Sequence, residues 1–84
     1  MGQKIRRKVT LYTKPGCHLC DDAKDEVERS GGEEFDLVEI NIAEDLVLYE
    51  RYKHDIPVVL IDDVEAFRHR LTAREFLLAL RQNS

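Results

Sequence analysis

The sequence predicts a single α/β domain: one four-stranded mixed sheet flanked by three helices. The chain has 84 residues, the size of one small domain, so we expect one domain over residues 1–84. Short apolar segments typical of strands alternate with amphipathic segments typical of helices, in the order β-α-β-α-β-β-α. The first strand-helix-strand unit predicts a parallel pair with a right-handed crossover, and the closing hairpin predicts an antiparallel pair.

The N-terminal third predicts one strand followed by one helix. Residues 9–13 are rich in β-branched and aromatic side chains, and Pro15-Gly16 ends this strand. Apolar residues then recur at the spacing of one buried helix face: Cys20, Ala23 and Val27. Gly31-Gly32 closes the predicted helix.

The middle of the chain predicts a second strand and a second helix. Residues 35–40 form two alternating sets, Phe35, Leu37 and Glu39 against Asp36, Val38 and Ile40. We interpret this segment as a largely buried strand. Asn41 and Glu44 have the spacing of a cap pair for the next helix. The side chains spaced for its inner face are Leu46, Tyr49 and Tyr52, with Leu48 beside them.

The C-terminal part predicts a hairpin and a last helix. Residues 57–61 form a short apolar strand with proline at its first position, and residues 64–68 form its partner. Between them, Asp62-Asp63 is a two-residue turn able to adopt positive φ. Thr72 and Glu75 form a capping-box pattern. The apolar stripe of this helix is Phe76, Leu77 and Leu80.

Composition and charge exclude several classes of function. Seventeen acidic and 13 basic residues give a net charge of −4, which argues against a dedicated nucleic-acid binder. No apolar run approaches the roughly 18–20 residues of a membrane span. The start of the chain has no apolar segment typical of a secretory signal, so we expect a cytoplasmic, reducing location. Two cysteines in that setting indicate catalysis or metal binding.

The chemistry of the sequence centres on Cys17 and Cys20, which lie three residues apart between the first strand and the first helix. A helix N-terminus carries unpaired N–H groups and partial positive charge, which favour a thiolate. Cys20 lies one turn further on the same face, so the two sulfur atoms can meet. We therefore expect the Cys17 thiolate to attack a substrate disulfide and Cys20 to displace the reduced product.

Two segments carry a resemblance to a known family: residues 11–20, which read LYTKPGCHLC, and residues 56–59, which read IPVV. Together with the element order, they make the chain resemble the glutaredoxin-like branch of the thioredoxin-fold proteins from Val9 to about Leu80. The resemblance implies a thioredoxin-like fold, with Cys17 as nucleophile and Cys20 as resolving thiol. It also implies that Pro57 is a cis proline facing them, although trans is the statistical default.

The resemblance also suggests how a substrate binds. Ile56, before the implied cis proline, would offer its backbone N–H and C=O groups to an extended substrate. The expected substrates are disulfide-containing proteins or small molecules, reduced by a monomer without a resident cofactor.

Two departures from the family pattern make the use of glutathione an open question. Dithiol glutaredoxins carry Pro-Tyr between the cysteines, and His18-Leu19 stands here. They also carry a Gly-Gly turn that helps to hold glutathione, and Arg68-His69-Arg70 stands in that neighbourhood, with side chains expected to crowd it. We expect weak glutathione binding, aided by the Thr72-capped helix N-terminus. The reductant is then glutathione or a thioredoxin-reductase-type protein.

The roles of the remaining polar residues stay open at the level of sequence. Lys14 is either a solvated loop residue or a charge that steadies the thiolate or an anionic substrate. His18 is either a solvated helix residue or an imidazolium that stabilises the thiolate. A second hypothesis is a binding module without turnover. In that case the two cysteines and two of His18, His54 and His69 would bind zinc, or two chains would share an iron–sulfur cluster, as some glutaredoxin relatives do.

Overall fold

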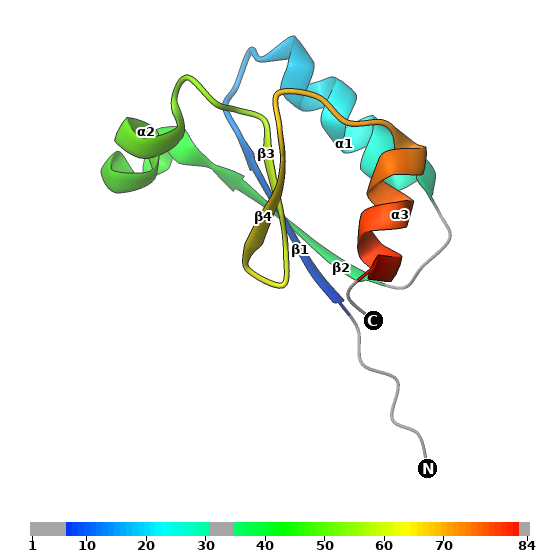
Figure 1. Ribbon diagram of the computed structural model, residues 1–84. Coiled ribbons are helices and arrows are strands. Elements are labelled where there is room, and N and C mark those ends of the chain that lie inside the picture. The colour runs from blue at the N-terminus through cyan, green and yellow to red at the C-terminus, as the bar shows by residue number, and fades with distance from the viewer. Residues whose placement is uncertain (1–6, 31–34, 83–84) are drawn as a thin grey trace.

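The computed structural model describes residues 7–30 and 35–82, which form one mixed sheet with helices on both faces (Figure 1). Its elements are β1 (Arg7–Thr13), α1 (His18–Ser30), β2 (Phe35–Asn41), a 3-10 helix η1 (Ile42–Glu44), α2 (Leu46–Tyr52), β3 (Val58–Ile61), β4 (Val64–Arg68) and α3 (Ala73–Gln82). The strand order is β2-β1-β3-β4, with β1 parallel to β2 and antiparallel to β3, and with β3 antiparallel to β4. The predicted fold class and order of elements are confirmed.

The main hydrophobic core lies between the sheet and the helices α1 and α3, which run over one face (Figure 1). Alternate residues of a strand face opposite sides, so β1 and β3 each send one set of apolar side chains to each face. The buried members of this core are Val9, Leu11, Ala23, Val27, Val59, Ile61, Leu71, Phe76 and Leu80. Phe76 is fully buried, and its ring meets Phe35 edge to face with the centroids 5.3 Å apart. This core fixes α1, and with it the cysteine pair, against the sheet.

A smaller core on the opposite face holds α2. Its buried residues are Ile42, Tyr52 and Val58, packed against half-buried side chains that include Tyr12 and Leu48. The rings of Tyr12 and Tyr52 lie 4.9 Å apart between centroids. The two cores confirm that helices cover both faces of the sheet.

The prediction that residues 35–40 form a largely buried strand is wrong in its burial. None of the seven residues of β2 is buried, and Val38 is 41% exposed. The reason is the strand order: β2 lies at the edge of the sheet and pairs only with β1 within the described residues. Its apolar pattern predicts a strand, but carries no information about the neighbours of that strand.

The second helix begins later than predicted. Asn41 caps η1, because its Oδ1 accepts the N–H of Ala43, and Asp45 caps α2 by accepting from the N–H groups of Val47 and Leu48. Leu46 is therefore the first residue of α2 and is 75% exposed, so its predicted place on the inner face is wrong. The other three predicted inner residues do pack in the smaller core: Leu48, Tyr49 and Tyr52.

The two turn and cap motifs of the C-terminal part are confirmed. Asp62 and Asp63 have φ values of 52° and 68° in the turn between β3 and β4. The Thr72 and Glu75 pair forms a reciprocal capping box at the start of α3. The hairpin turn lies at the end of the sheet opposite the cysteine pair (Figure 1), where Asp62 bonds to Arg7 and Lys8. In the described part of the chain, no helix is long and apolar enough to cross a membrane.

Candidate active site

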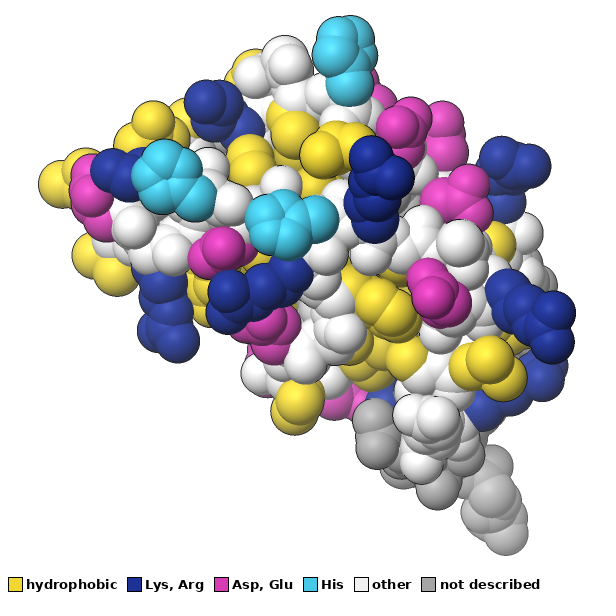
Figure 2. All heavy atoms as spheres, turned by 45° about the horizontal axis from the view of Figure 1, so that its top comes forward, with side chains coloured by type: hydrophobic (Ala, Val, Ile, Leu, Met, Phe, Trp, Pro, Cys, Tyr) yellow, Lys and Arg dark blue, Asp and Glu magenta, His cyan; other side chains and the backbone are white. Residues whose placement is uncertain are grey.

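Three segments far apart in sequence meet at one end of the sheet. Tyr12 in β1 is paired with Val58 in β3, which is paired with Arg68 in β4. The loop after β1, the segment before β3 and the segment after β4 therefore lie side by side, as Figure 1 shows. Figure 2 looks more directly onto this end, where all three histidine side chains of the chain come to the surface around hydrophobic side chains. The topology alone thus places Cys17 near the Ile56-Pro57 segment.

The loop between β1 and α1 positions Cys17 at the N-cap of α1. Gly16 has φ of 81°, a left-handed conformation that glycine adopts without strain, and the Cys17 N–H donates to the carbonyl of Lys14 at 3.3 Å. The Sγ of Cys17 then accepts the backbone N–H of Cys20 at 3.3 Å. The half-buried Cys17 sulfur is thus directed at the N–H groups of the first turn, as the sequence predicts.

The second cysteine has a different environment. Cys20 is 2% exposed and contributes to the apolar face of α1. Burial raises the pKa of the Cys20 thiol to about 12, and its hydrogen bond with Cys17 raises the pKa in the same direction. Both cysteines are free thiols, so the pair consists of one accessible sulfur and one buried, protonated sulfur.

The proline segment agrees with its predicted conformation. The Ile56–Pro57 peptide bond is cis, and Pro57 is fully buried. The carbonyl of Pro57 accepts the N–H of His69 at 2.8 Å, which ties this segment to the end of β4. Ile56 is half-buried against the smaller core. The N–H of Ile56 donates to the carbonyl of Tyr52 at 3.2 Å, so the prediction that this N–H is offered to substrate is wrong. The roles of the Ile56 carbonyl and of Pro57 in substrate binding stay predictions.

Lys14 and His18, the two residues expected to affect the thiolate, both lie at the surface. Lys14 is exposed, with its Nζ 6.0 Å from the centroid of the Tyr49 ring. It lines a hollow of about 330 Å³ that also reaches Cys20, Asp21 and Glu39. His18 is the first residue of α1 and is exposed. Lys14 therefore shares a surface hollow with the buried thiol, while the proposed effects of Lys14 and His18 on the thiolate stay predictions.

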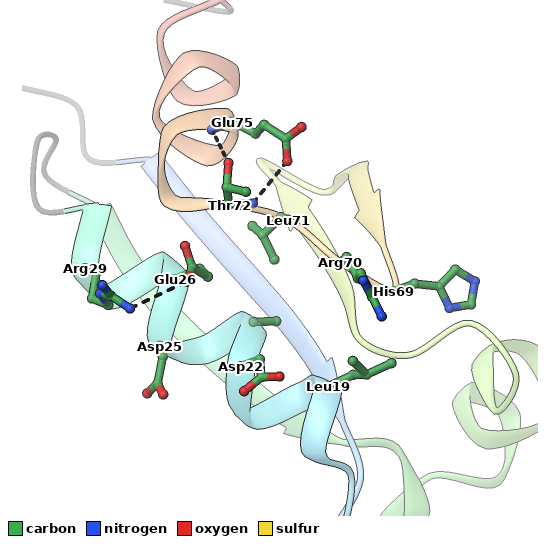
Figure 3. A pocket seen from close by; sticks show the side chains of 11 residues that line it. Leu19, Asp22, Asp25, Glu26, Arg29, His69, Arg70, Leu71, Thr72 and Glu75 are labelled. Carbon is green, nitrogen blue, oxygen red and sulfur yellow. Dashed lines mark hydrogen bonds and ion pairs between the residues drawn. The ribbon is translucent and has the colours of Figure 1, made fainter.

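Thr72 lies elsewhere, in a second hollow of about 460 Å³ between α1 and the segment leading into α3 (Figure 3). Neither Cys17 nor Lys14 lines this hollow, so the predicted site residues fall into two neighbouring groups. Of the three residues expected to crowd this region, His69 and Arg70 line the hollow. Arg68 does not, because its guanidinium bonds to Glu65 and lies 3.3 Å from Asp55.

One contact in the hollow has no counterpart in the sequence analysis. Glu26, on α1, accepts the backbone N–H of Ala73 at 2.7 Å and so joins α1 to the start of α3. Its other carboxylate oxygen lies 3.7 Å from Arg29. Forty-seven residues separate Glu26 from Ala73, so no local pattern signals this contact.

The zinc site considered from the sequence is not assembled. Among residues 7–30 and 35–82, no group of three or more His, Cys, Asp and Glu side chains could hold a metal ion. Figure 2 shows the three histidines as separate patches on the surface. The two cysteines therefore lack the histidine ligands that a four-ligand site needs.

Comparisons with known proteins agree with this geometry. The chain matches the family described as Glutaredoxin-like domain (DUF836) over residues 8–80. It is 29% identical over 70 residues to the "Glutaredoxin-like protein YDR286C homolog" of Dictyostelium discoideum, covering 75% of this chain and 65% of that protein. The match thus spans less than two thirds of the length of this relative.

Solved structures give the same fold. Protein Ne2328 from Nitrosomonas europaea has a TM-score of 0.78 at 26% identity, covering 95% of this chain and 98% of that one. Target XcR50 from X. campestris has a TM-score of 0.77 at 23% identity, covering 88% and 96%. A thioredoxin from Fasciola hepatica has a TM-score of 0.62 at 16% identity, covering 94% and 82%. With the family match over most of its length, the chain belongs to the glutaredoxin-like domain family.

Proposed function

We propose that the protein is a small thiol–disulfide oxidoreductase in which Cys17 attacks a substrate disulfide and Cys20 resolves the intermediate. The observation that carries this proposal is the Cys20 N–H to Cys17 Sγ hydrogen bond at the start of α1. The partial positive charge of a helix N-terminus favours a thiolate there. The buried Cys20 thiol, with its raised pKa, stays protonated near neutral pH and so reacts second.

The proposed reaction transfers two electrons in two exchanges. The Cys17 thiolate attacks one sulfur of the substrate disulfide, a Cys17–substrate disulfide forms, and the other substrate sulfur leaves as a thiolate that takes a proton. Cys20 then loses its proton and attacks Sγ of Cys17. A Cys17–Cys20 disulfide forms and the second substrate thiolate leaves. The protein is oxidised by two electrons and the substrate disulfide becomes two thiols.

An external reductant must restore the dithiol. We propose either glutathione or a thioredoxin-reductase-type protein, with the protein acting as a cytoplasmic monomer on disulfide-containing proteins or small molecules. We expect glutathione to serve poorly, because His69 and Arg70 line the hollow beside the start of α3, where a Gly-Gly turn would leave more room.

A stoichiometric oxidation experiment tests the function without a choice of reductase. Reduced protein, freed of reductant, is mixed with a small neutral disulfide such as 2-hydroxyethyl disulfide. We expect loss of both protein thiols, release of two substrate thiols and a Cys17–Cys20 link in the peptide map. The Cys17→Ser variant should release none. If wild type keeps both thiols, or if Cys17→Ser reacts as fast as wild type, the proposal is wrong.

The reductant is then identified by recycling the oxidised protein in two parallel assays, one with glutathione and its reductase and one with thioredoxin reductase. We expect faster recycling in the second assay. Faster recycling by glutathione would contradict our expectation for the reductant while leaving the exchange chemistry in place.

A further inference from the structure

The hollow between α1 and α3 extends from Leu19, in the first turn of α1, to the start of α3 (Figure 3). Its lining begins at Leu19, two residues after Cys17, and includes Glu26 seven residues further along α1. Glu26 lies nine residues beyond Cys17, which at the helical rise of about 1.5 Å per residue is roughly 13 Å along the helix. An extended peptide of about four residues spans that distance. A peptide whose disulfide is held at Cys17 can therefore place a flanking side chain at Glu26.

The start of α3 has the geometry of an anion site, because helix N-termini carry N–H donors and partial positive charge. Here several of its N–H groups are already bonded to side chains of the protein itself. Thr72 N donates to Glu75 Oε1 at 3.1 Å, and Glu75 N donates to Thr72 Oγ1 at 3.1 Å. Ala73 N donates to Glu26 Oε1 at 2.7 Å. Figure 3 shows Glu26 directed from α1 toward this turn, so a carboxylate from the neighbouring helix occupies the position of a bound anion.

The charges that line the hollow also disfavour a bound anion. Its lining contains four carboxylates and two guanidinium groups: Asp22, Asp25, Glu26, Glu75, Arg29 and Arg70. One of the two cations, Arg29, lies 3.7 Å from Glu26 and is directed at that carboxylate. An anionic substrate group that enters this hollow meets more like charge than opposite charge.

We propose that Glu26 is a specificity-determining residue that disfavours anionic substrates, so that the protein prefers disulfides flanked by neutral or basic side chains. This inference rests on the proposed function, because it concerns the substrate that the Cys17 thiolate attacks. Glu26 acts in two ways: its carboxylate repels a second carboxylate, and it withholds the Ala73 N–H as a donor. Two unit charges about 4 Å apart in water repel by an energy equivalent to roughly fivefold in a rate or binding constant.

The test uses three peptides that differ only in the charge of their flanking side chains. Symmetric disulfides of acetyl-Xaa-Gly-Gly-Gly-Cys-Gly-Gly-Gly-Xaa-amide, with Glu, Gln or Lys at Xaa, oxidise the pre-reduced protein in a single turnover. The measured quantity is the ratio of second-order rate constants for the Lys and Glu peptides. This ratio cancels any general loss of folding or reactivity, which lowers both rates alike.

Three variants separate the charge of Glu26 from its hydrogen bond and from the net charge of the protein. Glu26→Gln keeps an oxygen acceptor for Ala73 N–H but removes the charge. Glu26→Ala removes both. Glu28→Gln is the matched control, because it makes the same charge change on the exposed side of α1 and does not line the hollow.

We expect wild type to prefer the Lys peptide, with Gln between. The Lys/Glu ratio should fall about fivefold or more in Glu26→Ala, by two- to fivefold in Glu26→Gln, and by less than twofold in Glu28→Gln. An unchanged ratio in both Glu26 variants, or an equal change in Glu28→Gln, would overturn the role of Glu26. If none of the three peptides oxidises wild type, the proposed function itself fails, and the two failures are therefore distinguishable.

Discussion

The starts of α1 and α3 use the same position of a helix for opposite purposes. At α3 a hydroxyl oxygen fills the N-cap, and Thr72 Oγ1 accepts the N–H three residues later at 3.1 Å. At α1 a sulfur atom fills that position, and Cys17 Sγ accepts the N–H of Cys20 at 3.3 Å. Oxygen side chains are strong N-caps, whereas cysteine is not among the preferred residues. The comparison teaches that α3 begins with a stabilising cap, while α1 gives up part of that stability to keep a reactive thiol in the field of the helix.

The largest expected effect is the difference in reactivity between the two sulfur atoms of α1. A thiol with a pKa of about 12, as for Cys20, is about a thousandfold less ionised at pH 7 than one at the ordinary value of 9.0. Alkylation of the reduced protein with iodoacetamide at pH 7, followed by peptide mapping, should label Cys17 at least a hundredfold faster than Cys20. Equal labelling rates would contradict the assignment of Cys17 as the attacking thiol and Cys20 as the resolving thiol.

The same measurement has a predicted pH dependence. The thiolate is the reactive form, and its fraction in Cys20 rises about tenfold per pH unit while the pH stays below the raised pKa. Labelling of Cys20 should therefore still be increasing at pH 10. A plateau near pH 9 would show that burial does not hold the Cys20 proton.

A smaller effect is expected at the oxygen cap of α3. Thr72→Ala removes the acceptor for the Glu75 N–H and should lower the free energy of unfolding by about 1 kcal/mol. Urea unfolding followed by circular dichroism measures the change. Thr72→Ser, which keeps the hydroxyl, is the matched control and should stay within about 0.5 kcal/mol of wild type. Equal loss in both variants would assign the effect to the methyl group of Thr72 instead of the cap.

The smallest expected effect is on stability at Cys17, and it tests the comparison of the two N-caps most specifically. Cys17→Ser places a preferred capping oxygen where the sulfur lies, so it should raise the free energy of unfolding by about 0.5 kcal/mol. Cys17→Ala removes the acceptor and should be less stable than Cys17→Ser by about 1 kcal/mol. If the serine variant is no more stable than the alanine variant, then Cys17 is not acting as the N-cap of α1.

Local sequence patterns predicted the features that depend on few neighbouring residues. Thr72 and Glu75 lie three positions apart, and the capping box needs only that spacing and a helix after it. Asp62 and Asp63 tolerate positive φ, which the hairpin turn requires. The place of Cys17 followed from the strand and helix on either side of it. The cis state of Pro57 followed only from family resemblance, because about 95% of X-Pro bonds are trans.

Features that depend on distant residues were not predictable in this way. The exposure of β2 follows from its place at the sheet edge, and strand order is set by the whole fold. Asn41 and Asp45 are both capping residues, and only the structure shows that the first caps η1 and the second caps α2. The contact between Glu26 and Ala73 depends on how α1 and α3 pack, although each residue is ordinary in its own segment.

The central claim is that the sulfur at the start of α1 makes the first covalent bond with substrate. Trapping the intermediate tests this most directly: reduced Cys20→Ser and Cys17→Ser proteins are each mixed with the neutral disulfide peptide and measured by intact mass and peptide mapping. Our account predicts that Cys20→Ser accumulates one peptide disulfide-linked to Cys17, while Cys17→Ser stays unmodified. A peptide adduct on Cys20 in the Cys17→Ser protein, with none on Cys17 in the other variant, would contradict it.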